Sequence, residues 1–191
     1  MRPCHKATRA AAMAERSNAS LWGMRALYPV LALVLLFIAL LPVNLAPERF
    51  AGPDLLTALT LAWGSRRPDH LPAVSIAGVM LLADFLLQRP PGLWALLVLI
   101  GAEWMKSQDR RLRDSTFVDE IMTLAIVLFT ITLANRAVLI VLLIPPGALS
   151  LVAMQYVLTL LAYPILAGFL YIVLRVRRGA PADYDPVGRR I

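Results

Sequence analysis

Long apolar segments are the feature that most constrains how this chain of 191 residues can fold. A membrane-spanning helix needs roughly 17 to 25 mostly apolar residues. Six segments bounded by charges or prolines come near this length, at 28–45, 50–64, 70–87, 92–105, 117–144 and 148–174. The second and fourth are short, whereas the last two can cross with tilt. We therefore predict an all-α membrane protein with six transmembrane helices.

The composition agrees with this fold class. Hydrophobic residues make up 59% of the chain and charged residues 16%, whereas an average soluble domain is about half apolar and about a quarter charged. These values exclude an ordinary water-soluble globular fold. They also exclude a disordered chain, which requires low hydrophobicity and high charge.

The positions of lysine and arginine predict the orientation, because cytoplasmic loops retain these residues. With six crossings, all of the 19 basic residues except Arg49, Arg89 and Arg136 lie on the cytoplasmic side. If the short second segment were re-entrant, most of them would lie outside. We therefore predict that both termini are cytoplasmic. The net charge of +7 then signals orientation and does not predict binding to nucleic acid.

This topology divides the chain into three parts. They are a basic cytoplasmic tail at 1–20, a six-helix transmembrane domain at 21–178 and a second cytoplasmic tail at 179–191. Met1, Met13 and Met24 are all plausible first residues.

Charged residues inside the spans are candidate functional residues, since an ionised group is costly in a membrane. Asp84 is predicted about 5 Å inside the outer boundary of the third span, and Arg136 in the outer half of the fifth. Neither has another evident partner in the sequence. We hypothesise that they form an ion pair, with independent extension of each side chain toward the surface as the alternative.

Three acidic residues are predicted at the cytoplasmic boundary. Glu103 can pair with Lys106 one turn along its helix. Asp119 and Glu120 fall in the first turn of the fifth span, where carboxylates complement the helix dipole. Thr116 with Asp119 also approximates a capping box. We interpret all three acidic residues as structural.

The cytoplasmic loop 106–114 carries Arg110, Arg111 and Arg113. Such a basic segment can bind anionic lipid or a partner inside the cell, and lipid is the expectation.

Three further positions predict helix geometry. Pro164 lies in the middle of the sixth span and is expected to kink it. Gly78 and its alanine neighbours predict close packing of the third span within the bundle, with a groove for a partner as the alternative. Asp54, which follows Pro53, predicts the start of the second helix.

The motifs of common enzymes and metal sites are missing from the sequence. It has no glycine-rich phosphate loop, no Ser/His/Asp or Cys/His set and no carboxylates stacked at mid-span. Its single cysteine, Cys4, and its two histidines, His5 and His70, cannot form a disulfide or a metal cluster. We expect a protein that is not an enzyme, with no catalytic, cofactor-binding or metal-binding residue.

Several short motifs follow one another in a specific order. The short second span opens with Gly52-Pro53-Asp54-Leu55-Leu56 and is followed by an Arg-Arg-Pro loop. The next motifs are the run from Ile76 to Asp84 and the turn from Arg89 to Leu96. Tyr163-Pro164 precedes a basic end at 175–178. In this order, and in length and span number, the chain resembles the MreD family of bacterial rod shape-determining proteins. The tail 1–20 and the pair Asn135-Arg136 do not match the pattern.

The resemblance implies a non-enzymatic scaffold in the bacterial inner membrane, within the machinery of cell elongation. MreD-like proteins work with MreC, which has one span, a periplasmic coiled coil and a β domain. Through MreC they are linked to the peptidoglycan polymerase RodA, a class B penicillin-binding protein and the cytoplasmic actin-like MreB. The family is also similar in fold to the substrate-binding membrane subunits of energy-coupling-factor vitamin transporters.

The small amount of chain outside the predicted spans fits a scaffold, whose partners would bind within the bilayer or on short loops. The main alternative is a small-molecule binding subunit of a transporter, which requires a closed pocket at mid-depth with convergent polar groups. A membrane enzyme or lipid-handling protein is a further alternative and requires acidic or histidine side chains around a cavity.

Overall fold

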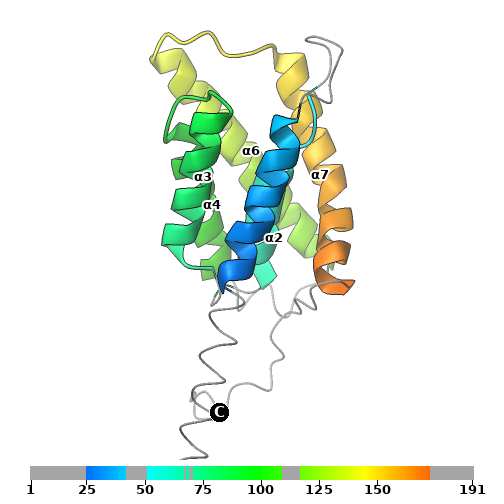
Figure 1. Ribbon diagram of the computed structural model, residues 1–191. Helices are drawn as coiled ribbons and strands as arrows, with labels where there is room; N and C mark the ends of the chain where they lie inside the picture. The colour runs from blue at the N-terminus through cyan, green and yellow to red at the C-terminus, as the bar shows by residue number, and fades with distance from the viewer. Residues whose placement is uncertain (1–24, 42–50, 67, 69–70, 109–116, 173–191) are drawn as a thin grey trace, which may run out of the picture.

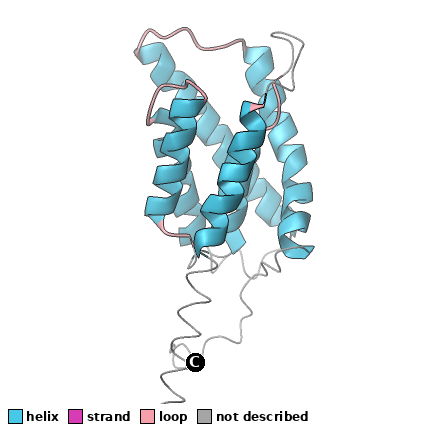
Figure 2. Ribbon diagram, in the orientation of Figure 1, coloured by secondary structure: helices cyan, strands magenta, loops and turns pink. Residues whose placement is uncertain are grey.

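The computed structural model describes residues 25–41, 51–66, 68, 71–108 and 117–172. Within these ranges the chain forms helices joined by loops, with no strand (Figure 2). The helices are Arg25–Leu40, α2 (Leu55–Arg66), α3 (Ala73–Leu86), α4 (Leu93–Ser107), α6 (Phe117–Val141) and α7 (Leu149–Ile172). Each of the six apolar segments overlaps one of these helices, which confirms the all-α prediction for the described residues.

Consecutive helices run in opposite directions and form an up-and-down bundle (Figure 1). α2 packs against α4 and α7, α4 also packs against α3 and α6, and α6 packs against α7. The turns 87–92 and 142–148 lie at one end, which we call the upper end as drawn in Figure 1. The start of the first helix, the end of α2 and the start of α6 lie at the lower end.

α2 is the central helix, although it has only 12 residues. Its residues 56–66 are all buried, as expected of a helix enclosed by its neighbours. Asp54 begins the helix as predicted, because its Oδ1 accepts a hydrogen bond from the backbone N–H of Thr57 at 3.0 Å. Trp63 packs edge-on against Tyr28 of the first helix, with ring centroids 5.9 Å apart.

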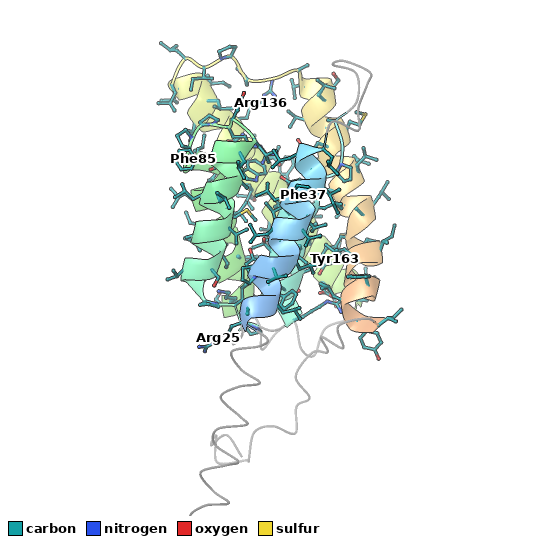
Figure 3. The ribbon with its side chains drawn as sticks, in the orientation of Figure 1. Arg25, Phe37, Phe85, Arg136 and Tyr163 are labelled. Atoms are coloured by element: carbon teal, nitrogen blue, oxygen red, sulfur yellow. The ribbon has the colours of Figure 1, made fainter. Side chains whose placement is uncertain are left out.

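The helices around α2 expose large apolar side chains on their outer faces (Figure 3). Examples from five helices, each more than half exposed, are Phe37, Phe85, Ile100, Phe129 and Ile165. α6 and α7 are long and apolar enough to cross a membrane. Only 22% of the most apolar 18-residue stretch of α6, and 11% of that of α7, is buried. The core helix of a soluble protein would be mostly buried, so these two helices are candidate membrane spans.

Asp84 holds the turn between α3 and α4. Its side chain is fully buried, and its Oδ2 accepts hydrogen bonds from the backbone N–H groups of Gly92 at 3.0 Å and Ala95 at 3.1 Å. Gly92 has a φ of 84°, which glycine adopts without a steric penalty. Asp84 therefore caps α4 from the preceding helix by satisfying N–H groups that have no partner within α4.

Two glycines lie in opposite surroundings. A Cβ atom on Gly101 would lie 2.8 Å from Cδ1 of Ile131 and 3.0 Å from Cγ1 of Val127, so glycine allows α4 and α6 to approach closely. Gly78 has nothing within 4 Å of the same position and is exposed on α3. The prediction that α3 packs closely within the bundle through Gly78 is therefore wrong. The close approach occurs at Gly101.

Pro164 lies inside α7, and the helix continues beyond it. Because proline has no N–H, the carbonyl of Leu160 lacks its usual helical partner. The kink expected here stays a prediction.

Candidate functional site

Polar side chains gather in two clusters, one at each end of α2. The first, which we call the Glu120 cluster, consists of Ser65, Arg66, Glu120 and Tyr163 and lies toward the lower end. The second, which we call the Asp54 cluster, consists of Asp54, Thr57, Arg89, Trp94 and Thr159 and lies toward the upper end.

In the Glu120 cluster one carboxylate oxygen has three polar neighbours. Oε1 of Glu120 accepts hydrogen bonds from the hydroxyls of Tyr163 at 2.6 Å and Ser65 at 3.0 Å. Nε of Arg66 lies 3.5 Å from the same oxygen, which makes an ion pair without hydrogen-bond geometry. All four side chains are buried. The cluster therefore joins α2, α6 and α7 through one enclosed acidic group.

This arrangement corrects the interpretation of Glu120 from the sequence. A first-turn carboxylate that only complements the helix dipole would face water, whereas Glu120 is fully buried and contacts two other helices. Arg66 and Glu120 were both predicted at the cytoplasmic boundary. Because both residues have opposite charges and were expected near the same membrane surface, the sequence contained a signal for the Arg66–Glu120 ion pair.

In the Asp54 cluster the polar groups connect α2, α4, α7 and the turn before α4. Nη1 of Arg89 lies 3.4 Å from Oδ2 of Asp54, and the Arg89 guanidinium lies 5.2 Å from the centre of the Trp94 ring. Nε1 of Trp94 donates to Oγ1 of Thr57 at 3.1 Å. The backbone N–H of Asp54 donates to Oγ1 of Thr159 at 2.8 Å.

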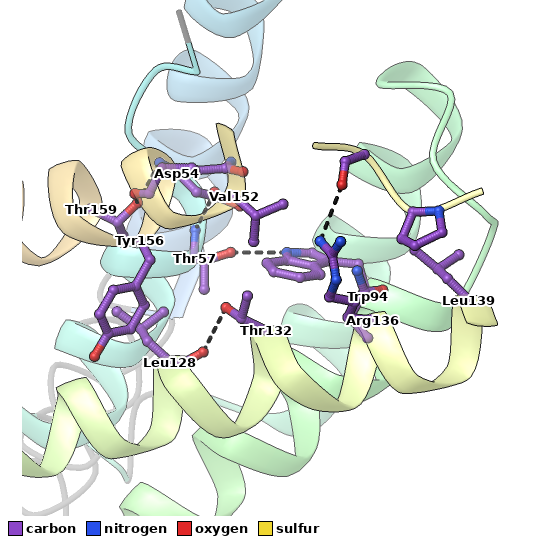
Figure 4. Close-up of a pocket in the computed structure, with 14 residues that line it drawn as sticks. Asp54, Thr57, Trp94, Leu128, Thr132, Arg136, Leu139, Val152, Tyr156 and Thr159 are labelled. Atoms are coloured by element: carbon purple, nitrogen blue, oxygen red, sulfur yellow. Dashed lines mark hydrogen bonds between the residues drawn. The ribbon is translucent and has the colours of Figure 1, made fainter. Parts of the chain in front are cut away.

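The Asp54 cluster borders a cavity of about 130 Å³ between α2, α4, α6 and α7 (Figure 4). Its wall is completed by the turn at Pro146 and Gly147. A second hollow of about 190 Å³ shares Trp94, Asn135, Leu139 and Gln155 with it and extends to Arg89 and Pro90. We call the two hollows together the upper pocket.

Asp84 and Arg136, which the sequence hypothesis paired, have different partners. The carboxylate of Asp84 caps α4, and Nη1 of Arg136 donates to the carbonyl of Gly147 at 3.1 Å. Both lie toward the same end of the bundle, as predicted, but the ion pair between them is wrong. Backbone groups at the start of α4 bind Oδ2 of Asp84, and a carbonyl of the turn 142–148 binds Nη1 of Arg136.

At the lower end, Glu103 and Lys106 form the predicted pair, with Nζ 2.6 Å from Oε1. Nζ of Lys106 also donates to the carbonyl of Leu71 at 2.6 Å. Asp119 lies in the first turn of α6 as predicted. The basic residues Arg110, Arg111 and Arg113 and the capping residue Thr116 lie outside the described residues, as do both predicted tails.

In the described part of the chain, no three acidic, histidine or cysteine side chains come together as a metal site. Comparison with protein-family models, curated proteins and solved structures finds no match to this chain. Function must therefore be argued from the bundle, its two polar clusters and its pocket.

Proposed function

We propose that this protein is a six-span scaffold of the bacterial inner membrane that resembles MreD and supports peptidoglycan synthesis and rod cell shape. In this proposal it binds MreC and, through MreC, belongs to a complex with RodA and a class B penicillin-binding protein. MreB would be reached from the cytoplasmic side. The fold would be similar to that of the substrate-binding subunits of energy-coupling-factor transporters, with both termini in the cytoplasm.

The observation that carries the proposal is the distribution of apolar surface around α2. The surrounding helices turn large apolar side chains outward, and an apolar surface of this extent indicates contact with lipid or with other proteins. Nearly all of the described chain belongs to this bundle. A protein built in this way has its helical faces as the main surface on which membrane partners can bind.

The charges at the two ends of the bundle support the proposed orientation. Arg25, Arg66 and Lys106 belong to the lower end, and Arg89 and Arg136 to the upper end. The lower end also leads into the basic loop 106–114 and the basic segment after α7. By the positive-inside rule, this distribution supports a cytoplasmic lower end.

The alternative, a vitamin-binding transporter subunit, draws some support from the upper pocket. Ligand pockets for molecules of drug size measure about 300 to 1,000 Å³, whereas the two hollows of the upper pocket measure about 130 Å³ and about 190 Å³. The pocket also adjoins the turn at Pro146 and Gly147 and so lies near one end of the bundle. This size and position favour the scaffold.

Depletion of the protein in its source cell tests the proposed function. We expect loss of rod shape and dispersed wall synthesis, both restored by the wild-type chain, and co-purification with MreC from crosslinked membranes. Normal shape combined with a vitamin requirement would contradict the scaffold and support the transporter subunit.

Cysteine labelling tests the topology independently of the partner. In a Cys4→Ser chain, Pro91→Cys places one thiol in the exposed turn at the upper end, and Ser107→Cys places one at the lower end. A membrane-impermeant maleimide should label Pro91→Cys in intact spheroplasts and Ser107→Cys only after lysis. Labelling of both before lysis would contradict six spans in this orientation.

A further inference from the structure

The upper pocket contains hydrogen-bond donors that no group among the described residues uses. The side-chain amides of Asn135 and Gln155 line both of its hollows, and within the described residues neither amide makes a hydrogen bond. The hydroxyl of Thr57 accepts from Trp94, which leaves its own hydrogen available to the cavity. Asn135 and Gln155 are only partly buried, so their amides are accessible to a polar group that enters the pocket.

The charge balance of the pocket is positive. The carboxylate of Asp54 is already engaged, with the Thr57 N–H on Oδ1 and Arg89 on Oδ2. Arg136 makes one hydrogen bond, to the carbonyl of Gly147, and no ion pair with a carboxylate among the described residues. A guanidinium carries five N–H donors, so most of those on Arg136 remain for a ligand.

The position of Arg136 makes these donors accessible to a ligand. Its side chain borders the cavity opposite Thr57 and next to the Trp94 ring (Figure 4). Arginine binds carboxylate and phosphate groups through two parallel N–H bonds. A cavity of about 130 Å³ is close in volume to an engineered cavity of about 150 Å³ that holds benzene, which is space for one compact group.

We propose that the upper pocket binds an oxyanion, either a phosphate or a carboxylate group, through Arg136 and the amides of Asn135 and Gln155. The ligand enters from the upper end, where the turns 87–92 and 142–148 border the pocket. The oxyanion belongs either to a lipid headgroup or to a water-soluble molecule. This inference does not depend on the proposed scaffold role.

Ligand-induced stabilisation of the purified full-length chain tests the proposal, because a ligand that binds the folded state raises the unfolding temperature. In a neutral detergent, inorganic phosphate and acetate are titrated against sodium chloride at equal ionic strength. In a second arm, nanodiscs of phosphatidylglycerol are compared with nanodiscs of phosphatidylcholine. We expect a saturable rise in unfolding temperature in at least one arm.

Three variants connect this response to the pocket. Arg136→Gln should weaken the response about tenfold or more, because it removes a charge-assisted contact. Asn135→Leu should weaken it less and leave the fold intact, since this amide has no partner to lose. Arg25→Gln, the same substitution at the lower end (Figure 3), should leave it unchanged.

Each outcome decides between stated possibilities. A response to phosphate or acetate that requires Arg136 assigns the pocket to a soluble anion. A response to phosphatidylglycerol alone, again dependent on Arg136, assigns it to a lipid headgroup. The proposal is overturned if neither arm responds, or if Arg136→Gln and Arg25→Gln behave alike.

Discussion

The Glu120 cluster and the Asp54 cluster lie at opposite ends of the same short helix and differ in their access to solvent. Around Glu120, the hydroxyls of Ser65 and Tyr163 donate to one buried carboxylate, and all four side chains of the cluster are buried. Around Asp54, the polar groups border a cavity and leave amides unused. An enclosed polar cluster joins helices of the fold, whereas a cluster beside a cavity can also bind a ligand.

The comparison also explains why α2 can be short. α2 supplies Ser65 and Arg66 to one cluster and Thr57 to the other. Each end of the helix is therefore fixed by side chains of longer helices. Twelve residues at 1.5 Å rise span about 18 Å, well below the roughly 30 Å of a bilayer core, whereas α6 and α7 are long enough to cross one.

The largest effect on stability is expected for Glu120→Gln. The substitution keeps the shape of the side chain but leaves Arg66 buried without its counter-charge, and breaking a buried ion pair costs about 3–5 kcal/mol. Chemical denaturation in detergent measures the free energy of unfolding. Glu103→Gln is the matched control, because the Glu103 side chain is exposed in its ion pair with Lys106. Such a pair should contribute about 0–1 kcal/mol to the free energy of unfolding. Equal losses would contradict the enclosed role of the Glu120 cluster.

Tyr163→Phe should be the next most costly change. It removes the hydroxyl that donates to Glu120 at 2.6 Å, and a hydrogen bond to a charged group contributes about 1.5–3 kcal/mol. Tyr156→Phe is the control, since its hydroxyl donates to the neutral carbonyl of Ala125. Its loss should be smaller, about 0.5–1.5 kcal/mol. The reverse order would show that Glu120 is not the centre of the lower cluster.

A packing change between the two clusters provides a reference for their polar energies. Gly101→Ala would place a methyl group 2.8 Å from Ile131 and should cost about 1–3 kcal/mol through overpacking. Gly78→Ala, in open space on α3, should be neutral or stabilising by up to about 1 kcal/mol. The same unfolding measurement compares them, and a loss in Gly78→Ala would restore the predicted packing role of Gly78.

At the upper end, Trp94→Phe should cost less than any loss at the lower cluster. It removes the Nε1 donor to Thr57, a neutral hydrogen bond that contributes about 0.5–1.5 kcal/mol. Water can enter the cavity beside Thr57 and replace the donor, which reduces the loss. A loss as large as that of Glu120→Gln would show that the upper end is as closed as the lower.

The sequence predicted the helices well because their signal is local. Apolar segments bounded by prolines and charges each overlap one helix. The cap of Asp54 on Thr57 and the Glu103–Lys106 pair each join residues three apart in the chain. Helix ends were less accurate. The second segment was predicted to end at residue 64, whereas α2 continues to Arg66.

The clusters could not be predicted because their partners are distant in the chain. Glu120 lies 55 residues from Ser65 and 43 from Tyr163, and the contacts depend on how the helices pack. The Asp84–Arg136 pair was wrong for a related reason. A charged residue in a span was assumed to need an opposite charge, whereas N–H groups at the start of α4 bind Oδ2 of Asp84.

The smallest effect on stability is expected for Asn135→Leu, in the wall of the upper pocket. The Asn135 amide makes no hydrogen bond within the described residues, so its removal should change the free energy of unfolding by less than about 0.5 kcal/mol. Gln155→Leu should behave alike, because its amide lines the same hollows. A loss near that of Tyr163→Phe would mean that these amides already support the fold. Near-neutral variants would instead show that the upper end retains polar groups that folding does not require. Such groups are expected in a binding site, whereas the polar groups of the Glu120 cluster are expected to be required for folding.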